Sequence, residues 1–291
     1  MLYNITECVR IVVRIFCMTR NNIMPRFFVL VAGVLALFAF VASVEASHTW
    51  GGYHWARTTT PFTLRLGDNV NTAWDSYLTT ASTDWNVSTV LQTAVVAGLG
   101  GRNCKAVAGT VQVCNSKYGN NGWLGLAQIW ISGSHITQGT AKMNDTYFST
   151  AKYNTPAWRN LVMCQEVAHT FGLGHQDEAF GNYNLGTCMD YTNAPSGGTV
   201  GVFNYGPSNE HPNFHDYEEL AIIYAHLDSF NSFTAISVSN RGASAAAQSG
   251  DFENASEWGK ATKKDARGRD NTFEKDLGGG NKLITHVFWV Q

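Results

Sequence analysis

Residues 164–178 read CQEVAHTFGLGHQDE, and of all parts of the sequence this stretch is the most informative about the fold and its chemistry. Two histidines, His169 and His175, stand on either side of Gly172. Gln165 and His169 are four residues apart, so on a helix their side chains share one face. Gly172 can end that helix and let the chain turn back, which brings His175 towards the same point. The spacing therefore predicts a helix and a turn that present ligands to one small cation.

The predicted helix has recognisable signals at both ends. Thr155 is a suitable N-cap residue, and Pro156 follows at the first helical position, where its missing N–H costs nothing. The run from Trp158 to Phe171 then stops at Gly172, a typical residue just after a helix. We therefore expect one helix from Pro156 to about Phe171.

A second run, GTCMDY over residues 186–191, makes the similarity to a known family specific. The first stretch resembles the metzincin metallopeptidase signature H-E-x-x-H-x-x-G-x-x-H, and GTCMDY resembles the Met-turn of that clan. The residues in register with the signature are Glu166, His169, Gly172 and His175. The resemblance covers roughly residues 60–230.

The resemblance implies an α+β, metzincin-like fold, with a twisted mixed β-sheet, an active-site helix, a Met-turn and a C-terminal helix. It implies a secreted zinc-dependent endopeptidase of the matrixin or astacin type, acting on a peptide or protein. In such an enzyme Zn²⁺ activates a water molecule, and Glu166 would be its general base. Tyr191 would assist at the oxyanion, and Met189 would lie beneath the metal.

The chain departs from the signature at its first ligand, where Gln165 replaces a histidine. An amide oxygen is a poorer match to zinc than an imidazole nitrogen. Three interpretations stay open. Gln165 is a weak ligand beside His169 and His175, another side chain replaces it as a ligand, or the site has lost its metal. The alternative function is therefore a catalytically inactive, secreted binding protein on the same scaffold. A surface or carbohydrate binder that uses exposed aromatic residues is a third reading.

Three other side chains are candidates for a substitute ligand. His211 and His215 are four residues apart, and Asp177 lies two residues beyond His175. Pro212 argues against a helix over 211–215 that would place the two histidines on one face.

The N-terminus has the pattern of a secretory signal peptide over residues 1–46. An uncharged apolar run, 27–44, follows Arg20 and Arg26, and small residues precede a cleavage site after Ala46. An uncleaved membrane anchor is the rival reading, because a run of this length is close to the shortest that spans a bilayer. Met18 or Met24 could be the true start. We expect a secreted, extracellular protein without stable membrane association after cleavage.

Cysteine usage agrees with export. Removal of residues 1–46 leaves four of the six cysteines, an even number that suggests two disulfides. Four cysteines allow three pairings, and we favour the pairs that are local in sequence, Cys104–Cys114 and Cys164–Cys188. The second pair would tie the active-site helix to the Met-turn.

Composition excludes several other classes of protein. The chain has 291 residues, of which 44% are hydrophobic and 14% charged, so it is not a disordered charged polymer. Its 20 Lys and Arg against 22 Asp and Glu give a net charge of −2, which disfavours nucleic acid as a partner. We expect a monomer.

The remaining organisation is expected to be a catalytic domain over 47–230, followed by a tail over 231–291. The tail would be a flexible linker rich in Gly, Ser and Ala, with a strand-like run at 282–290. Within the domain we expect 125–131 to be an edge strand along which substrate lies antiparallel. The other expected elements are helices over 71–86 and 216–227 and strands over 62–66, 87–96, 106–114, 124–132 and 135–147.

Overall fold

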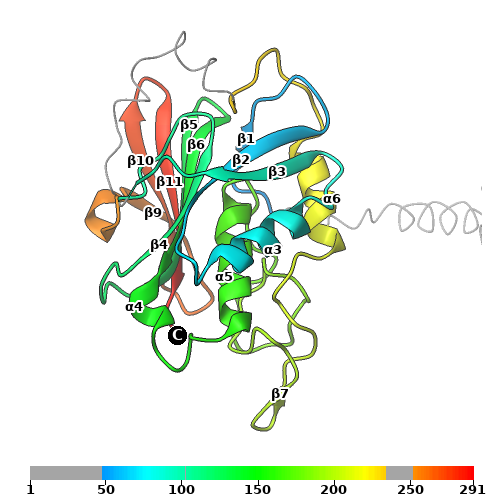
Figure 1. Cartoon of the computed structure of the whole chain (residues 1–291), viewed down its shortest axis with the longest axis vertical. Helices are drawn as coiled ribbons and strands as arrows, with labels where there is room; N and C mark the ends of the chain where they lie inside the picture. Colours follow the sequence, from blue (N-terminus) through cyan, green and yellow to red (C-terminus); the bar gives the residue numbers. More distant parts are fainter. Residues whose placement is uncertain (1–47, 102, 234–251) are drawn as a thin grey trace, which may run out of the picture. The chain divides into compact units, whose positions relative to one another are not determined.

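The fold is built around one mixed β-sheet, whose strands pair parallel on one side and antiparallel on the other (Figure 1). The computed structural model describes residues 48–101, 103–233 and 252–291. Within them, 48–291 form one unit of α+β type. The predicted signal peptide lies outside the described residues. None of the helices in the described ranges is both long and apolar enough to cross a membrane.

The sheet has nine strands in the described part of the chain, in the order β3-β2-β4-β6-β5-β11-β10-β9, with β1 beside β6. The pairs β3–β2, β2–β4 and β4–β6 are parallel. The pairs β6–β5, β5–β11, β11–β10 and β10–β9 are antiparallel. The strands are β1 His54–Trp55, β2 Phe62–Asn69, β3 Leu91–Ala97, β4 Val111–Ser116, β5 Trp123–Ser132, β6 His135–Asn144, β9 Lys260–Lys264, β10 Asp270–Gly278 and β11 Asn281–Trp289.

The predicted edge strand at 125–131 is an interior strand, which corrects that expectation. It belongs to β5, which pairs with β6 on one side and with β11 on the other. Its side chains are buried along almost the whole strand, as is typical of a strand covered on both faces. The outer strands of the sheet path are β3 and β9.

Among the described residues, four helices and a 3₁₀ turn accompany the sheet. They are α3 Asp75–Trp85, α4 Asp145–Phe148, α5 Pro156–His169, α6 Phe214–Ile223 and η2 Ala255–Glu257. Helix α5 lies against β5 and β6, and α3 lies against α5 and β3 (Figure 1). The large core between these helices and the sheet contains the buried side chains of Trp74, Trp85 and Phe171.

The start of α5 is as predicted from sequence. The Thr155 hydroxyl accepts a hydrogen bond from the Trp158 backbone N–H, and Pro156 is the first helical residue. The helix ends at His169, two residues earlier than expected. Gly172 has a φ of 98°, and a Cβ there would lie 2.1 Å from the Tyr53 carbonyl oxygen. Glycine is therefore needed both for the turn and for the contact with the 48–53 segment.

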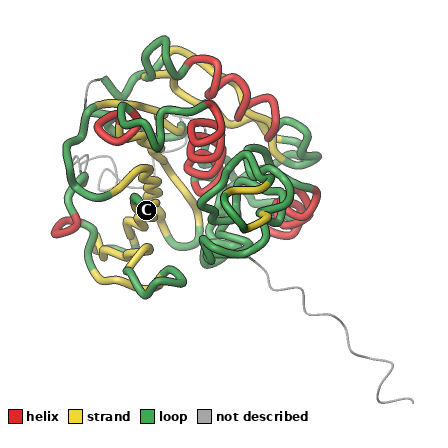
Figure 2. Tube along the Cα trace, turned by 90° about the horizontal axis from the view of Figure 1, so that it is seen from below, coloured by secondary structure: helices red, strands yellow, loops and turns green. Residues whose placement is uncertain are grey.

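The segment between α5 and α6 is almost entirely loop (Figure 2). Its regular structure is the short pair β7 Thr199–Val200 and β8 Phe203–Asn204. Helix α6 begins with a capping box, in which Asn213 and Asp216 exchange hydrogen bonds with each other's backbone.

The C-terminal part of the chain joins the same sheet. The strand-like run at 282–290 is confirmed as β11, which pairs with β5 over its whole length. The part of the tail before this run is predicted to be a flexible linker, but where it is described it forms η2, β9 and β10. A second core lies under these strands, formed chiefly by Trp123, Leu126 and Trp130 with Trp258, Phe273 and Leu283. Burial of these large apolar side chains fixes the tail to β5.

Both predicted disulfides are present. Cys104 and Cys114 are bonded with a Cα–Cα distance of 5.9 Å, and Cys164 and Cys188 with 6.0 Å. Such bonds are typical of proteins that mature in an oxidising environment. The second bond joins α5 to the predicted Met-turn.

Candidate metal centre

Three histidines from distant parts of the chain converge on one point. His169 is the last residue of α5, His175 lies in the turn after it, and His286 lies in β11. One ligand atom of each lies within 4.8 Å of the others. The Nε2 atoms of His169 and His175 are 3.0 Å apart, and the His286 ring centre lies 4.0 Å from the His169 ring centre. Three imidazoles so placed can share one cation.

The other nitrogens of His169 and His175 show which way these rings are protonated. His169 Nδ1 lies 2.8 Å from the Leu173 carbonyl oxygen, which can only accept, so Nδ1 donates. His175 Nδ1 lies 2.8 Å from Glu178 Oε1. Burial alone would raise the pKa of Glu178, but the hydrogen bond from His175 holds it below its usual range, so the carboxylate accepts. In its neutral form each ring then directs the lone pair of Nε2 at the other, as two ligands of one metal do.

His286 completes the cluster from the C-terminal strand. Its Nε2 lies 3.0 Å from the Tyr191 hydroxyl oxygen. Its Nδ1 is buried, has no hydrogen-bond partner among the described residues, and lies 3.8 Å from Glu166 Oε2. Trp50 covers His169, with ring centres 5.2 Å apart, and also approaches His286.

Burial sets the charge of this site. It lowers the pKa values of His169 and His286 well below the usual range for histidine, and the nearby imidazoles lower them further. Both rings are therefore neutral at pH 7, with lone pairs available to a metal. Burial also raises the pKa of the Tyr191 hydroxyl well above its usual range, so that this group keeps its proton.

Glu166 lies fully buried beside the histidines, on α5. Neither carboxyl oxygen has a hydrogen-bond partner within the described ranges, and burial raises the pKa of Glu166 well above its ordinary value. Room for the side chain comes from Gly125 in β5, where a Cβ would lie 2.4 Å from Glu166 Oε1. An unpaired buried carboxyl group is costly, so a bound cation or an ordered water is the natural partner for it.

Gln165 points to the Met-turn. Its Nε2 donates a hydrogen bond of 2.7 Å to the Cys188 carbonyl oxygen, while Oε1 has no partner in the described part of the chain. A third imidazole, His286, stands in the cluster with His169 and His175. The role of Gln165 as a weak ligand stays a prediction.

The predicted Met-turn lies beside the turn that carries His175. The Gln176 N–H donates to the Met189 carbonyl oxygen at 2.7 Å, and the Tyr191 N–H donates to that of Asp177 at 3.0 Å. The Met189 side chain is fully buried in the main core. The Tyr191 ring centre lies 4.4 Å from the His175 ring centre.

The substitute ligands considered from sequence lie elsewhere. His211 Nδ1 is 2.7 Å from Asp84 Oδ2, and His215 groups with His48 and Glu219. The carboxylate of Asp177 accepts the Ala179 N–H at 2.8 Å in its own turn. These residues are therefore outside the three-histidine cluster.

Sequence reasoning missed His286. The strand-like run that contains it is recognisable, but its neighbour in the cluster, His169, is more than a hundred residues earlier in the chain. Pairing of β11 with β5 places His286 opposite Ala127 and Phe288 opposite Gly125. No local pattern encodes that register; a histidine inside an apolar C-terminal strand was the available signal.

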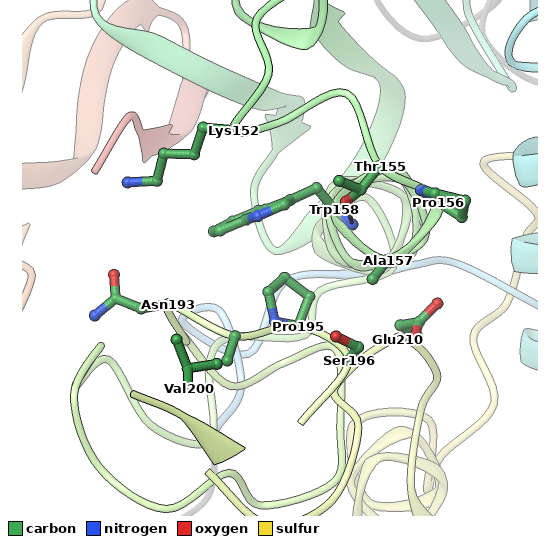
Figure 3. Close-up of a pocket in the computed structure, with 11 residues that line it drawn as sticks. Lys152, Thr155, Pro156, Ala157, Trp158, Asn193, Pro195, Ser196, Val200 and Glu210 are labelled. Atoms are coloured by element: carbon green, nitrogen blue, oxygen red, sulfur yellow. Dashed lines mark hydrogen bonds between the residues drawn. The ribbon is translucent and has the colours of Figure 1, made fainter. Parts of the chain in front are cut away.

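An open pocket of about 450 Å³ lies near the beginning of α5 (Figure 3). Trp158 and Pro195 stand at its centre, with Lys152 and Glu210 towards its ends. The histidine on α5 is about three turns further along the helix, so the pocket is separate from the cluster.

Comparison with models of known protein families and with curated proteins finds no match to the chain.

Proposed function

We propose that the protein is a secreted, zinc-dependent endopeptidase of metzincin type whose metal ligands are His169, His175 and His286. The observation that carries the proposal is the convergence of three buried imidazoles beside the unpaired carboxyl group of Glu166. The Met-turn, the two disulfides and the α+β fold agree with it. The metzincin assignment rests on the resemblance of the two motifs.

The donor set fits Zn²⁺. Zinc favours imidazole nitrogens at 2.0–2.1 Å in tetrahedral geometry, which corresponds to nitrogens about 3.3 Å apart. The Nε2 atoms of His169 and His175 are 3.0 Å apart, and both rings have Nδ1 held by an acceptor. Three histidines leave a fourth position, as catalytic zinc sites require.

The residues around this position have the chemistry for peptide hydrolysis. Bound zinc would polarise the substrate carbonyl and lower the pKa of a water molecule. Glu166 would accept a proton from the water and deliver it to the leaving amine. A neighbouring cation favours the ionised form of a carboxyl group and so offsets the effect of burial on Glu166. Tyr191 holds His286 through its hydroxyl, and the same hydroxyl could donate to the oxyanion.

One observation favours the second candidate, a catalytically inactive binding protein on the same scaffold. Strand β11 lies antiparallel on β5 and fills the place expected for a peptide substrate. The imidazole of His286, which β11 supplies, is itself buried. A substrate would have to approach from the fourth metal position and not as an added strand on β5.

Zinc content and hydrolysis, measured on the same preparations, separate the candidates. We expect the whole chain to bind zinc and to cleave casein, and Glu166→Gln to keep the zinc while losing activity by about 10²-fold or more. His286→Ala should lose one zinc equivalent, while the control His211→Ala, at a histidine outside the cluster, should lose none.

Zinc without casein hydrolysis in the wild type would favour the inactive binding protein. Equal zinc content in wild type and His286→Ala would refute the metal centre and, with it, the endopeptidase. Equal activity in wild type and Glu166→Gln would remove Glu166 as the base.

A further inference from the structure

A second group of metal-binding side chains lies away from the three-histidine cluster. It contains His54 of β1, His135 at the start of β6, and His226 and Asp228 in the segment after α6. Ligand atoms of His54, His135 and Asp228 lie within 4.8 Å of one another. The His226 ring joins them, with its centre 4.7 Å from that of His54.

Asp228 is the centre of the group. Its Oδ1 lies 3.1 Å from His135 Nε2, 3.6 Å from His226 Nε2 and 3.8 Å from His54 Nε2. Its Oδ2 accepts the Arg57 backbone N–H at 2.9 Å, and its own N–H donates to the Arg57 carbonyl oxygen at 2.7 Å. These bonds fix the carboxylate so that Oδ1 is directed at the three imidazoles.

His54 is oriented by a hydrogen bond on the far side of its ring. Its Nδ1 lies 3.0 Å from the Gly52 carbonyl oxygen, which can only accept, so Nδ1 donates. Nε2 is then the nitrogen that faces the group, 3.2 Å from His226 Nε2 and 3.8 Å from Asp228 Oδ1. A backbone acceptor that fixes the second ring nitrogen in this way is typical of metal-binding histidines.

We propose that this group is a second zinc site held by Nε2 of His54 and His135 and Oδ1 of Asp228, with Nε2 of the more exposed His226 completing the set. Tetrahedral zinc places its ligand atoms about 3.3 Å apart. The separations are 3.1, 3.6 and 3.8 Å to Oδ1, and 3.2 Å between the Nε2 atoms of His54 and His226. With His226 bound, four protein ligands leave no open position, so the site is structural.

The ion would join three parts of the chain that lie far apart in sequence. It would connect β1 and the start of β6 with the segment after α6. The 48–57 segment that carries His54 also carries Trp50, which covers His169 and His286. The second zinc would therefore hold one wall of the first metal centre in place without taking part in its chemistry.

Zinc stoichiometry of the whole chain tests the site. We expect two equivalents of zinc in the wild type after dialysis, and one in the double variant His135→Ala/His226→Ala. His226 is a suitable target because 57% of its side chain is exposed, so its removal should be tolerated by the fold. The control is His211→Ala, which removes another exposed histidine, paired with Asp84, and should keep two equivalents.

The zinc stoichiometry still tests the second site if the three-histidine cluster binds no zinc. In that case the wild type would hold one equivalent and the double variant none, whereas His286→Ala would keep the one. Equal zinc content in the wild type and the double variant would overturn the second site. If the double variant does not fold by circular dichroism, His226→Ala alone replaces it, and competition with a chromophoric chelator should show zinc bound about 10-fold more weakly or worse. Unchanged zinc affinity in that variant would overturn the site.

Discussion

The space that Gly125 leaves for Glu166 can be tested by filling it. Gly125 lies in β5, opposite Phe288 of β11 and Met143 of β6. A Cβ at this position would lie 2.4 Å from Glu166 Oε1 and 2.7 Å from Val162 Cγ1. Both contacts are far shorter than van der Waals distance, so Gly125→Ala must displace the carboxyl group or the helix that carries it.

The expected cost follows from these contacts. Overpacking of a well-filled core costs about 1–3 kcal/mol. Replacing glycine also restricts the unfolded chain, which returns about 0.4–1 kcal/mol. The net loss is then roughly 0–2.6 kcal/mol, towards the upper end because the contacts are so short, and for a unit of this size each kcal/mol lowers Tm by about 2–4 °C. The metal ligands are untouched, so zinc content should stay at the wild-type value while casein hydrolysis falls with the displacement of Glu166.

Thermal unfolding and a double-mutant cycle measure this effect. In the Glu166→Ala background the closest contact is gone, so Gly125→Ala should cost at least about 0.5 kcal/mol less there than in the wild type. Gly181→Ala is the matched control, because a Cβ at Gly181 has no described atom within 4 Å. If Gly125→Ala unfolds at the wild-type temperature and keeps full activity, Glu166 does not lie against β5 and the geometry of the site is wrong.

Two further predictions concern the surroundings of the centre. The Cys164–Cys188 bond closes 24 residues and should stabilise the fold by about 3 kcal/mol; its replacement by two alanines should also weaken zinc binding, because it joins α5 to the Met-turn. Burial raises the pKa of Asp190 to about 6, so the native carboxyl keeps its proton between pH 4 and 6 while the unfolded one ionises. The free energy of unfolding should therefore fall as pH rises through that interval, by about 1–2 kcal/mol after solvent screening, and the fall should be smaller in Asp190→Asn. Asp216, whose pKa burial also raises to about 6, should account for part of the remaining fall.

Each of these two predictions has its own control. Replacing Cys104 and Cys114 removes a bond of similar entropic value outside the centre, so stability should drop while zinc affinity is retained. Equal loss of zinc affinity in both cysteine variants would contradict a specific role for Cys164–Cys188. For Asp190, urea unfolding at pH 4, 5 and 6 is the assay. The same slope with pH in wild type and Asp190→Asn would show that another group is responsible.

Local sequence signals were sufficient for helix α5 and the turn that follows it. Thr155, Pro156 and Gly172 mark the helix through capping and backbone geometry, which depend on a few adjacent residues. The spacing of His169 and His175 about Gly172 likewise brings their two Nε2 atoms together. The run at 282–290 is apolar and β-branched enough to be recognised as a strand.

The position of the 125–131 strand could not be obtained in this way. Its residues predict a strand, but whether a strand lies at an edge depends on what pairs with it. Burial of Trp258, Phe273 and Leu283 against the far face of β5 brings the C-terminal strands there, and these residues are over a hundred positions away. The prediction of a flexible linker in the tail failed for the same reason. The composition of a segment does not show which part of the fold it packs against.

Helix α5, the turn after it and two of the three clustered imidazoles follow from local sequence, since they depend on interactions within about twenty residues. Three further features follow from the folded chain alone: His286 joins the cluster, β5 lies inside the sheet, and His54, His135, His226 and Asp228 meet. Those outcomes depend on strand pairing and core packing between distant segments, whose free energy is settled by the whole fold and not by local propensity.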